Sequence, residues 1–404
     1  MINEANGGAS MVRTIVVGGG WAGCAAALAA AKAGSQVLLI ERTDLLLGTG
    51  LVGGIFRNNG RYTAAEEAIA MGGGDLFVAM DANSRHEGVN FPGHNHASFY
   101  DVSTMEPLVK KVLQNYNVEI RTKVRVCDVV KYGKTIKAVV LDDGEIVKGD
   151  VFVDTTGTAG PMGNCLTYGN GCAMCILRCP SFGPRISVTA KAEIKEIMGC
   201  KADGSYGAMS GSCKLNKDSL SSEIRDKLEK TGVVVLSVPK NLQKTGSLSK
   251  KACSQYAVAE YAANLVLLDT GHAKLMTSYF PLDDLRKIPG LERARYEDPY
   301  AGGIGNSMRY LGIAPCNNVL KVEGADNLFC AGEKSAILVG HTEAIVTGLL
   351  AGHNAVVYCT IGYAKVMSKV SSLDTLIFFI KPIRIFLCSV SVQLFQMWLK
   401  LFSV

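Results

Sequence analysis

The stretch Thr14 to Glu41, TIVVGGGWAGCAAALAAAKAGSQVLLIE, decides the fold of this chain. Ile15, Val16 and Val17 read as a short buried strand, and the glycine-rich run Gly18–Gly23 follows it. An alanine-rich helix is predicted from about residue 22 to residue 33, and a second strand from 36 to 40 ends in Glu41. The order strand, glycine turn, helix, strand and acid is typical of a dinucleotide-binding unit.

Each part of this stretch has a mechanical role. Gly18 allows the tight turn, Gly20 lets the backbone approach a pyrophosphate, and Gly23 lets the helix lie close to the sheet. The helix N-terminus offers N–H groups and a positive dipole end to the phosphates. Glu41, about twenty residues on, is placed to bond ribose hydroxyls. The motif alone is compatible with FAD or NAD. The contacts predicted here are Gly18, Gly20, Trp21, Ala22, Gly23, Glu41 and Arg42.

The far end of the chain carries a second pattern. Residues 327–333 read as a short strand that ends in glycine and Glu333, and Gly340 opens a helix rich in small residues. This resembles the C-terminal flavin motif of two-dinucleotide-binding-domain flavoproteins, and Asp150–Gly157 resembles their third FAD-contacting strand. The resemblance implies FAD, with its ribityl chain near Glu333. The further contacts predicted are Gly53, Val126, Thr156, Gly157, Gly332, Glu333, Gly340, His341 and Thr342.

Three segments narrow the resemblance to one family. Residues 288–294, 327–333 and 340–355 are similar to the C-terminal part of the glucose-inhibited division protein A family. That family includes flavoproteins that modify the tRNA wobble uridine and folate- and FAD-dependent tRNA uridine methyltransferases. Arg178–Ser181 is similar to a Cys-Pro-Ser stretch of the wobble enzymes. The family's C-N-P-A-I-G-G loop has no counterpart, because Gly48–Gly54 contains no cysteine. The long helical C-terminal domain of the wobble enzymes has no counterpart either.

Composition agrees with a globular enzyme of 404 residues, with 48% hydrophobic residues and 44 glycines. The net charge of +6, without a dense basic run, permits an RNA partner but does not argue for one. Polar first residues and thirteen cysteines lead us to expect reduced thiols in a cytoplasm. We predict an α/β fold: a Rossmann-like FAD-binding domain with an inserted α+β substrate domain. The expected segments are 11–160 and 326–362 for the FAD domain, 161–325 for the insertion and 371–404 for a tail.

Four cysteines lie close together, at Cys165, Cys172, Cys175 and Cys179, and Pro180 follows the last. The spacing is similar to the latter part of a bacterial ferredoxin run, which suggests an iron–sulfur cluster passing electrons to FAD. A structural zinc site is a second use. Redox or nucleophilic thiols are a third, with Cys179 favoured because Arg178 would stabilise its thiolate. Small buried packing residues remain the ordinary alternative.

The apolar tail from Ser371 to Val404 is interrupted by Lys381–Arg384. Its second half barely meets the length of about 18 to 20 apolar residues that a spanning helix needs. A membrane-surface helix, which would give a peripheral membrane contact, an amphipathic docking helix and an abnormal terminus all remain open.

The sequence favours an FAD-dependent oxidoreductase acting on a small-molecule substrate or electron donor. His341, at the start of the flavin-edge helix, would stabilise negative charge on reduced flavin, and Cys179 is the candidate nucleophile. The alternative that the resemblance implies is flavin- and folate-dependent uridine modification of tRNA or rRNA. A non-catalytic flavin and thiol redox sensor is the third hypothesis. The RNA contacts expected for the alternative are Lys214, Lys217, Lys240, Lys244, Lys250 and Lys251.

Overall fold

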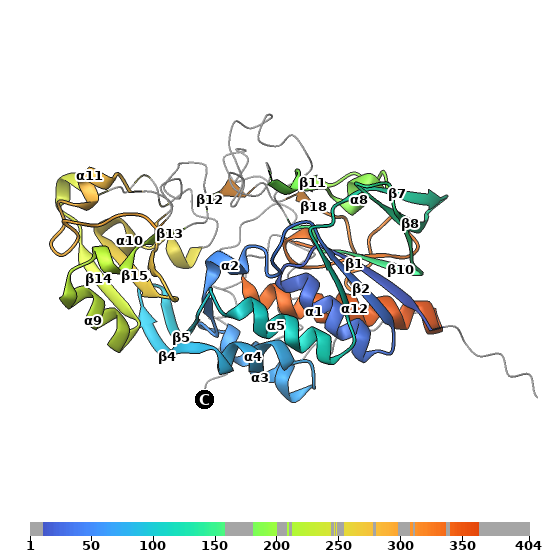
Figure 1. Ribbon diagram of the computed structural model, residues 1–404, viewed down its shortest axis with the longest axis horizontal. Helices are drawn as coiled ribbons and strands as arrows, with labels where there is room; N and C mark the ends of the chain where they lie inside the picture. The colour runs from blue at the N-terminus through green and yellow to red at the C-terminus, as the bar shows by residue number, and fades with distance from the viewer. Residues whose placement is uncertain are drawn as a thin grey trace, which may run out of the picture.

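The central sheet of the chain has five parallel strands in the order β19-β10-β1-β2-β6 (Figure 1). Their bounds are β1 (Arg13–Val17), β2 (Gln36–Glu41), β6 (Glu119–Thr122), β10 (Val151–Asp154) and β19 (Leu328–Cys330). The computed structural model describes residues 11–157, 181–199, 208–209, 212–243, 246, 248, 254–277, 280–297, 308–309, 312–336 and 340–362. The inner strands are continuous apolar runs, as strands covered on both faces require. The predicted Rossmann-like α/β fold is confirmed.

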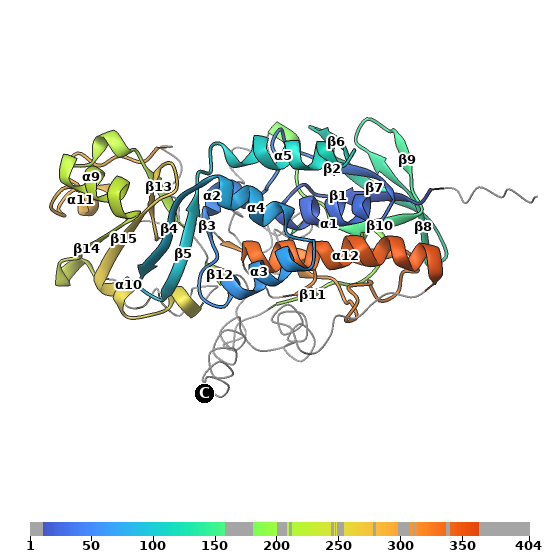
Figure 2. The same ribbon diagram turned by 90° about the horizontal axis from the view of Figure 1, so that it is seen from below.

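Helices and a three-stranded meander cover the two faces of this sheet. Figure 1 shows the helices below the sheet and the meander above it, and Figure 2 shows α1 and α12 side by side. The helices are α1 (Trp21–Lys32), α3 (Arg61–Ala70), α4 (Asp75–Ala82), α5 (Met105–Asn115) and α12 (His341–Ile361). The meander is β7 (Val126–Tyr132), β8 (Thr135–Leu141) and β9 (Ile146–Lys148), and the short helix α8 (Val188–Lys191) lies beside it. One hydrophobic core joins all these elements to the sheet.

The strand, helix and strand predicted between residues 15 and 41 are confirmed, with ends shifted by one or two residues. A hairpin turn at Asp142–Gly144 joins β8 and β9, and Gly144 has the φ of +90° that such a turn demands. The segment between β2 and α5 holds more structure than the sequence indicated. It contains α2 (Gly50–Gly53), α3, α4 and a sheet in the order β3-β5-β4, with β3 (Ile55–Phe56), β4 (Ser84–Phe91) and β5 (His94–Tyr100).

The insertion has its own antiparallel sheet in the order β13-β16-β15-β14 and its own hydrophobic core. Its elements are β13 (Cys213–Leu215), η1 (Lys217–Ser219), α9 (Ser222–Thr231), β14 (Val233–Ser237), η2 (Lys240–Leu242), η4 (Ser254–Tyr256), α10 (Glu260–Ala263), β15 (Asn264–Asp269), β16 (Ala273–Leu275) and α11 (Leu282–Leu285). The Ser221 hydroxyl caps α9 by accepting from the Ile224 N–H, and Gly232, with φ of +75°, ends it. A small core of β4 and β5 residues with Val266, Leu268 and Met276 joins the hairpin to the insertion.

Two short strand pairs and a single-turn helix complete the described chain. They are β11 (Ile197–Met198) with β18 (Gly312–Ile313), β12 (Ala208–Met209) with β17 (Met308–Arg309), and η5 (Gly332–Lys334). Among the described helices, α12 is long and apolar enough to span a membrane, with a mean hydropathy of 1.5. It packs against α1, and 56% of that window is buried, which fits the central helix of a globular core.

Candidate functional site

The turn between β1 and α1 depends on close backbone approaches at two glycines and on hydrogen bonds from the Thr155 hydroxyl. Gly18 has φ of +104°, and a Cβ there would lie 2.5 Å from the Thr155 carbonyl oxygen. A Cβ on Gly23 would lie 1.8 Å from the Gly18 carbonyl oxygen. The Thr155 hydroxyl lies 2.8 Å from the Val17 carbonyl oxygen and 2.7 Å from that of Gly18. Gly18 and Gly23 are therefore required by the fold itself.

Gly20 differs from its neighbours because nothing lies within 4 Å of the Cβ it lacks. It is the N-cap of α1, and no side chain caps the helix there. The first N–H groups of α1 therefore face a space that this glycine keeps open. Glu41, 8% exposed, stands beside this space: one carboxylate oxygen accepts from the Gly19 N–H at 2.7 Å, and the other from the Thr43 N–H at 2.8 Å.

Helix α12 packs along the length of α1. A Cβ on Gly348 would lie 2.3 Å from the Ala22 carbonyl oxygen, and one on Gly352 would lie 2.0 Å from that of Ala26. Because the contacts advance together along both helices, α1 and α12 run parallel with their backbones in contact. The Trp21 and His341 rings, one from the first residue of each helix, have centroids 6.0 Å apart. Since Gly348 is the eighth residue of α12 and Ala22 the second of α1, the N-terminus of α12 extends about 9 Å beyond that of α1, and both positive helix ends border the same region.

The start of α12 is itself built to stay open. Gly340 is its N-cap and no side chain caps the helix; a Cβ on Gly340 would lie 2.0 Å from a Glu343 carboxylate oxygen. Glu343 is instead held by a buried ion pair with Arg61, at 2.6 Å. The Thr342 hydroxyl is buried and has no hydrogen-bond partner among the residues that the structure describes. A buried hydroxyl at a helix N-terminus fits a hydrogen bond to a bound ligand.

The strand-end residues predicted from the C-terminal motif come to the same place. Gly332 has φ of +67°, and its missing Cβ would lie 2.8 Å from the Ala22 side chain. This brings η5, with Glu333 half-buried, beside the first turn of α1. Thr156 and Gly157 follow β10, and the Thr156 hydroxyl donates to an Asp154 carboxylate oxygen at 2.7 Å.

Two predicted contacts lie nearer the outer end of the sheet. The Arg42 guanidinium donates to the Gly183 carbonyl at 2.5 Å, so this side chain is bound to the segment after residue 180. Val126 is 2% exposed and begins β7, where it pairs with Leu141.

The turn α2 stands where the family resemblance places the cysteine loop, and it contacts both helix starts. A Cβ on Gly53 would lie 2.2 Å from the His341 imidazole, and one on Gly50 would lie 2.4 Å from the Trp21 indole nitrogen. The His341 Nδ1 donates to the Ile55 carbonyl at 2.8 Å, which places the proton of the neutral ring on Nδ1. Gly53 and His341, both predicted as cofactor contacts, are therefore packed against each other.

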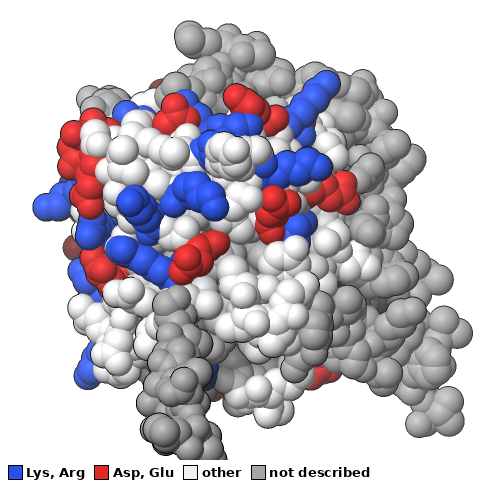
Figure 3. All heavy atoms as spheres, turned by 90° about the vertical axis from the view of Figure 1, so that its right-hand side faces the viewer, with Lys and Arg blue, Asp and Glu red and all other residues white. Residues whose placement is uncertain are grey.

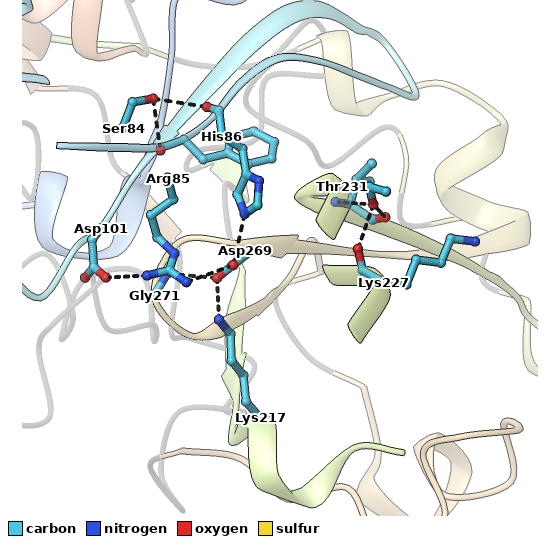
Figure 4. Close-up of polar contacts among 11 residues, drawn as sticks. Ser84, Arg85, His86, Asp101, Lys217, Lys227, Thr231, Asp269 and Gly271 are labelled. Atoms are coloured by element: carbon cyan, nitrogen blue, oxygen red, sulfur yellow. Dashed lines mark hydrogen bonds and ion pairs between the residues drawn. The ribbon is translucent and has the colours of Figure 1, made fainter. Parts of the chain in front are cut away.

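Several residues near the site had no clear sequence signal. Tyr100 donates its hydroxyl to the Gly50 carbonyl at 2.7 Å, and burial raises its pKa well above the usual range. Asp269, at the end of β15, accepts hydrogen bonds from Arg85, His86 and Lys217 and is fully buried (Figure 4). It ties the hairpin β4–β5 to the insertion.

The cysteine cluster at Cys165, Cys172, Cys175 and Cys179 lies outside the described residues, as does the 371–404 tail. Within the part of the chain that the structure describes, no group of three or more His, Cys, Asp or Glu side chains could hold a metal ion. The iron–sulfur, zinc and thiol hypotheses therefore stay predictions.

The residues present fit FAD. The uncapped N-terminus of α1 opens onto the space beside Gly20, which suits a pyrophosphate, and the uncapped N-terminus of α12, about two turns further along, suits the electron-rich edge of a flavin. Glu41 lies beside the Gly20 space and Glu333 belongs to η5, next to the first turn of α1; both carboxylates suit acceptance from ribose and ribityl hydroxyls.

Known structures share this architecture. GidA from Aquifex aeolicus matches with a TM-score of 0.66 at 17% identity, over 92% of this chain and 67% of that chain; in a second crystal form the TM-score is 0.62, at 17% identity, over 92% and 70%. A geranylgeranyl bacteriochlorophyll reductase-like protein from Thermoplasma acidophilum matches with a TM-score of 0.52 at 12% identity, over 96% and 83%. At these identities the likeness shows the fold. No curated protein sequence matches the chain.

The sequence model of one family, glucose inhibited division protein A, matches residues 13–274 and 266–360. Those ranges include the glycine turn, the α2 turn, the insertion sheet and the start of α12. The chain therefore belongs to the glucose inhibited division protein A family and is an FAD-dependent flavoprotein enzyme.

Proposed function

We propose that this enzyme is an oxidoreductase that exchanges electrons between its flavin and a substrate arriving on the side of the insertion. The observation that carries this proposal is that the N-terminus of α1 opens onto the space left by Gly20, while the N-terminus of α12, about two turns further along, borders the same region. Beside these helix ends lies α2, whose far side faces the lysines of β13 and β16.

The protein's own groups would bind and orient the cofactor. The α1 N–H groups would hold the pyrophosphate, with Glu41 on the ribose and Glu333 on the ribityl chain. The α12 N-terminus, with the Thr342 hydroxyl, would stabilise negative charge at the flavin edge. His341 would add to this only when both ring nitrogens carry a proton, because its Nδ1 proton is donated to the Ile55 carbonyl. When bound, FAD supplies one- and two-electron redox chemistry.

The alternative is flavin- and folate-dependent modification of a uridine in tRNA or rRNA, which family membership supports. Against it, Gly48–Gly54 offers no thiol beside His341, where the family resemblance expects a cysteine. Lys214 and Lys217, expected as RNA contacts, are engaged by the Leu51 carbonyl and by Asp269; Lys240 lies exposed in η2. Lys244, Lys250 and Lys251 lie outside the described residues.

One face of the molecule also argues against a broad RNA surface. The face that includes the β7–β8 end carries Lys and Arg side chains interleaved with Asp and Glu (Figure 3). Ion pairs in this part of the chain include Arg121 with Glu119 at 2.9 Å and with Glu145 at 2.8 Å. A mixed surface of this kind gives no single-sign field for phosphates.

The test measures uridine modification and small-molecule redox turnover in parallel. Holoenzyme is incubated with total RNA, a reductant and labelled methylenetetrahydrofolate, and in parallel the flavin spectrum is followed with NADH, NADPH and small-molecule acceptors. We expect repeated flavin turnover with a small donor and acceptor, and weak RNA binding. Label in uridine, together with RNA affinity that falls steeply with salt, would establish the alternative instead. A single flavin reduction without turnover would indicate a redox sensor.

A further inference from the structure

The α2 turn is a single helical turn, so the carbonyls at its C-terminal end lack further helical partners. Its N–H groups bond backward, with Leu51 to Gly48 at 3.2 Å and Val52 to Thr49 at 3.2 Å. The helix then ends at Gly54, which has φ of +84°. The carbonyls of residues 51–53 are left at its C-terminal end.

Side chains donate to these three carbonyls and to that of Gly50. The Tyr100 hydroxyl donates to Gly50 at 2.7 Å, and the Lys214 ammonium donates to Leu51 at 3.4 Å. The Lys274 ammonium donates to both Val52 and Gly53. The tyrosine belongs to β5, but both lysines belong to the insertion. The turn is therefore held on one side by a neighbouring domain.

The two lysines are an unusual pair. Lys214 on β13 and Lys274 on β16 are directly paired across antiparallel strands, and like charges in that position repel each other. Lys274 is also 5% exposed, although burying an ammonium is costly. The carbonyl end of a helical turn carries partial negative charge, so α2 offsets both costs.

The opposite side of the turn faces the flavin site. Gly53 is packed against His341, Gly50 against Trp21, and Gly48 against Gly20, whose Cα would lie 3.4 Å from a Cβ on Gly48. Figures 1 and 2 both show α2 between the insertion strand β13 and the helices α1 and α12. A displacement of the two lysine side chains would therefore shift the α2 turn and, through it, the residues that line the cofactor site.

We propose that Lys274, assisted by Lys214, is a positioning residue that fixes the α2 turn against His341 and thereby sets the environment of the flavin. The insertion would then control the flavin through these two ammonium groups as well as cover the substrate. This inference rests on the flavin site but not on the choice of substrate.

The test compares Lys274→Met with Lys274→Arg and with the exposed-surface control Lys227→Met, in apo and holo protein. Hydrogen exchange of the segment 46–56 reports the turn directly. Loss of both bonds from Lys274 should speed its exchange about tenfold or more in the methionine variant. The arginine variant should recover part of the protection, and Lys227→Met should match the wild type.

The flavin midpoint potential is the second measurement. Removing a nearby cation should move it to a more negative value in Lys274→Met, because reduced flavin carries negative charge. Wild-type exchange over 46–56, or an unchanged potential, would overturn the proposal. If Lys274→Met does not fold, Lys214→Met must give smaller shifts of exchange and potential in the same directions; wild-type behaviour of Lys214→Met would equally overturn the proposal.

Discussion

Gly352 on α12 faces Ala26 on α1 so closely that a Cβ on the glycine would lie 2.0 Å from the alanine carbonyl oxygen. One turn earlier, Gly348 stands in the same relation to Ala22. These two glycines let the helix backbones touch and bring both helix N-termini to the cofactor site. The C-terminal segment of the chain thereby completes a site that the N-terminal segment begins.

Gly352→Ala should therefore destabilise the protein. The added methyl group meets backbone, which cannot move aside as a flexible side chain would, and overpacking of this kind costs about 1–3 kcal/mol. Urea unfolding measures the loss, and FAD affinity should fall with it because the start of α12 is displaced. Thr360→Ala, at an exposed position of the same helix, should change stability by no more than about 0.5 kcal/mol. Equal stability of Gly352→Ala and wild type would refute the helix contact.

Asp269 predicts a stability change at acid pH. Burial alone would raise the pKa of this carboxyl, but hydrogen bonds from Lys217, His86 and Arg85 outweigh it and hold the pKa at about 2. Because folding lowers the pKa, the ionised carboxylate stabilises the fold above its unfolded value of about 4, and this stabilisation is lost as the pH falls through about 2. The stabilisation that is lost is on the order of 1–2 kcal/mol, because the cationic partners of Asp269 are partly solvated.

The measurement is urea unfolding of wild type and Asp269→Asn from pH 7 to pH 2. The gap in unfolding free energy between them should stay constant down to about pH 5 and narrow below it. Asp218→Asn, at an exposed position of the same domain, is the control and should show no such narrowing. A gap that is constant down to pH 2 would contradict the assigned ion pairs.

The cysteine hypotheses give a prediction about metal content. If Cys172, Cys175 and Cys179 ligate one centre, each Cys→Ser change should lower bound metal by a similar amount, because a centre that lacks any ligand is destabilised. Metal analysis and a visible spectrum of anaerobically purified protein decide this. Absence of both iron and zinc in the wild type would eliminate both ligand hypotheses. Loss of activity in Cys179→Ser alone, without metal in any form, would support the nucleophile.

The fold could be predicted from local pattern because its signals are short-range. The run from β1 to Glu41 encodes strand, turn and helix within thirty residues, and Gly332 with Gly340 marks the returning strand and helix. The contact between α1 and α12 could not be predicted, because Gly348 and Gly352 read only as small residues in an apolar helix. Their partners lie more than three hundred residues away in the sequence.

The candidate site was likewise predictable from the sequence only in part. Gly18, Gly20 and Gly23 form one pattern in the sequence, but the structure separates two glycines that the fold needs from one that leaves open space. The roles of Tyr100 and Lys274 depend on the pairing of distant strands with the α2 turn. Lys214 looked like a solvated or RNA-facing lysine because nothing nearby in the sequence reveals the Leu51 carbonyl that it contacts.

The central claim is that FAD lies with its pyrophosphate at Gly20, and Gly20→Val tests it most directly. The backbone there, with φ of −66° and ψ of 179°, suits any L-residue, and nothing in the structure lies within 4 Å of the Cβ that the substitution adds. The free energy of unfolding of the apo variant should therefore lie within about 1 kcal/mol of the wild-type value. Gly23→Ala, whose methyl group would meet the Gly18 carbonyl, should be destabilised instead. Titration of refolded apoprotein with FAD should show affinity lowered roughly a hundredfold or more in Gly20→Val, because the side chain fills the space of the phosphates. A folded Gly20→Val protein that purifies with stoichiometric FAD would contradict the account.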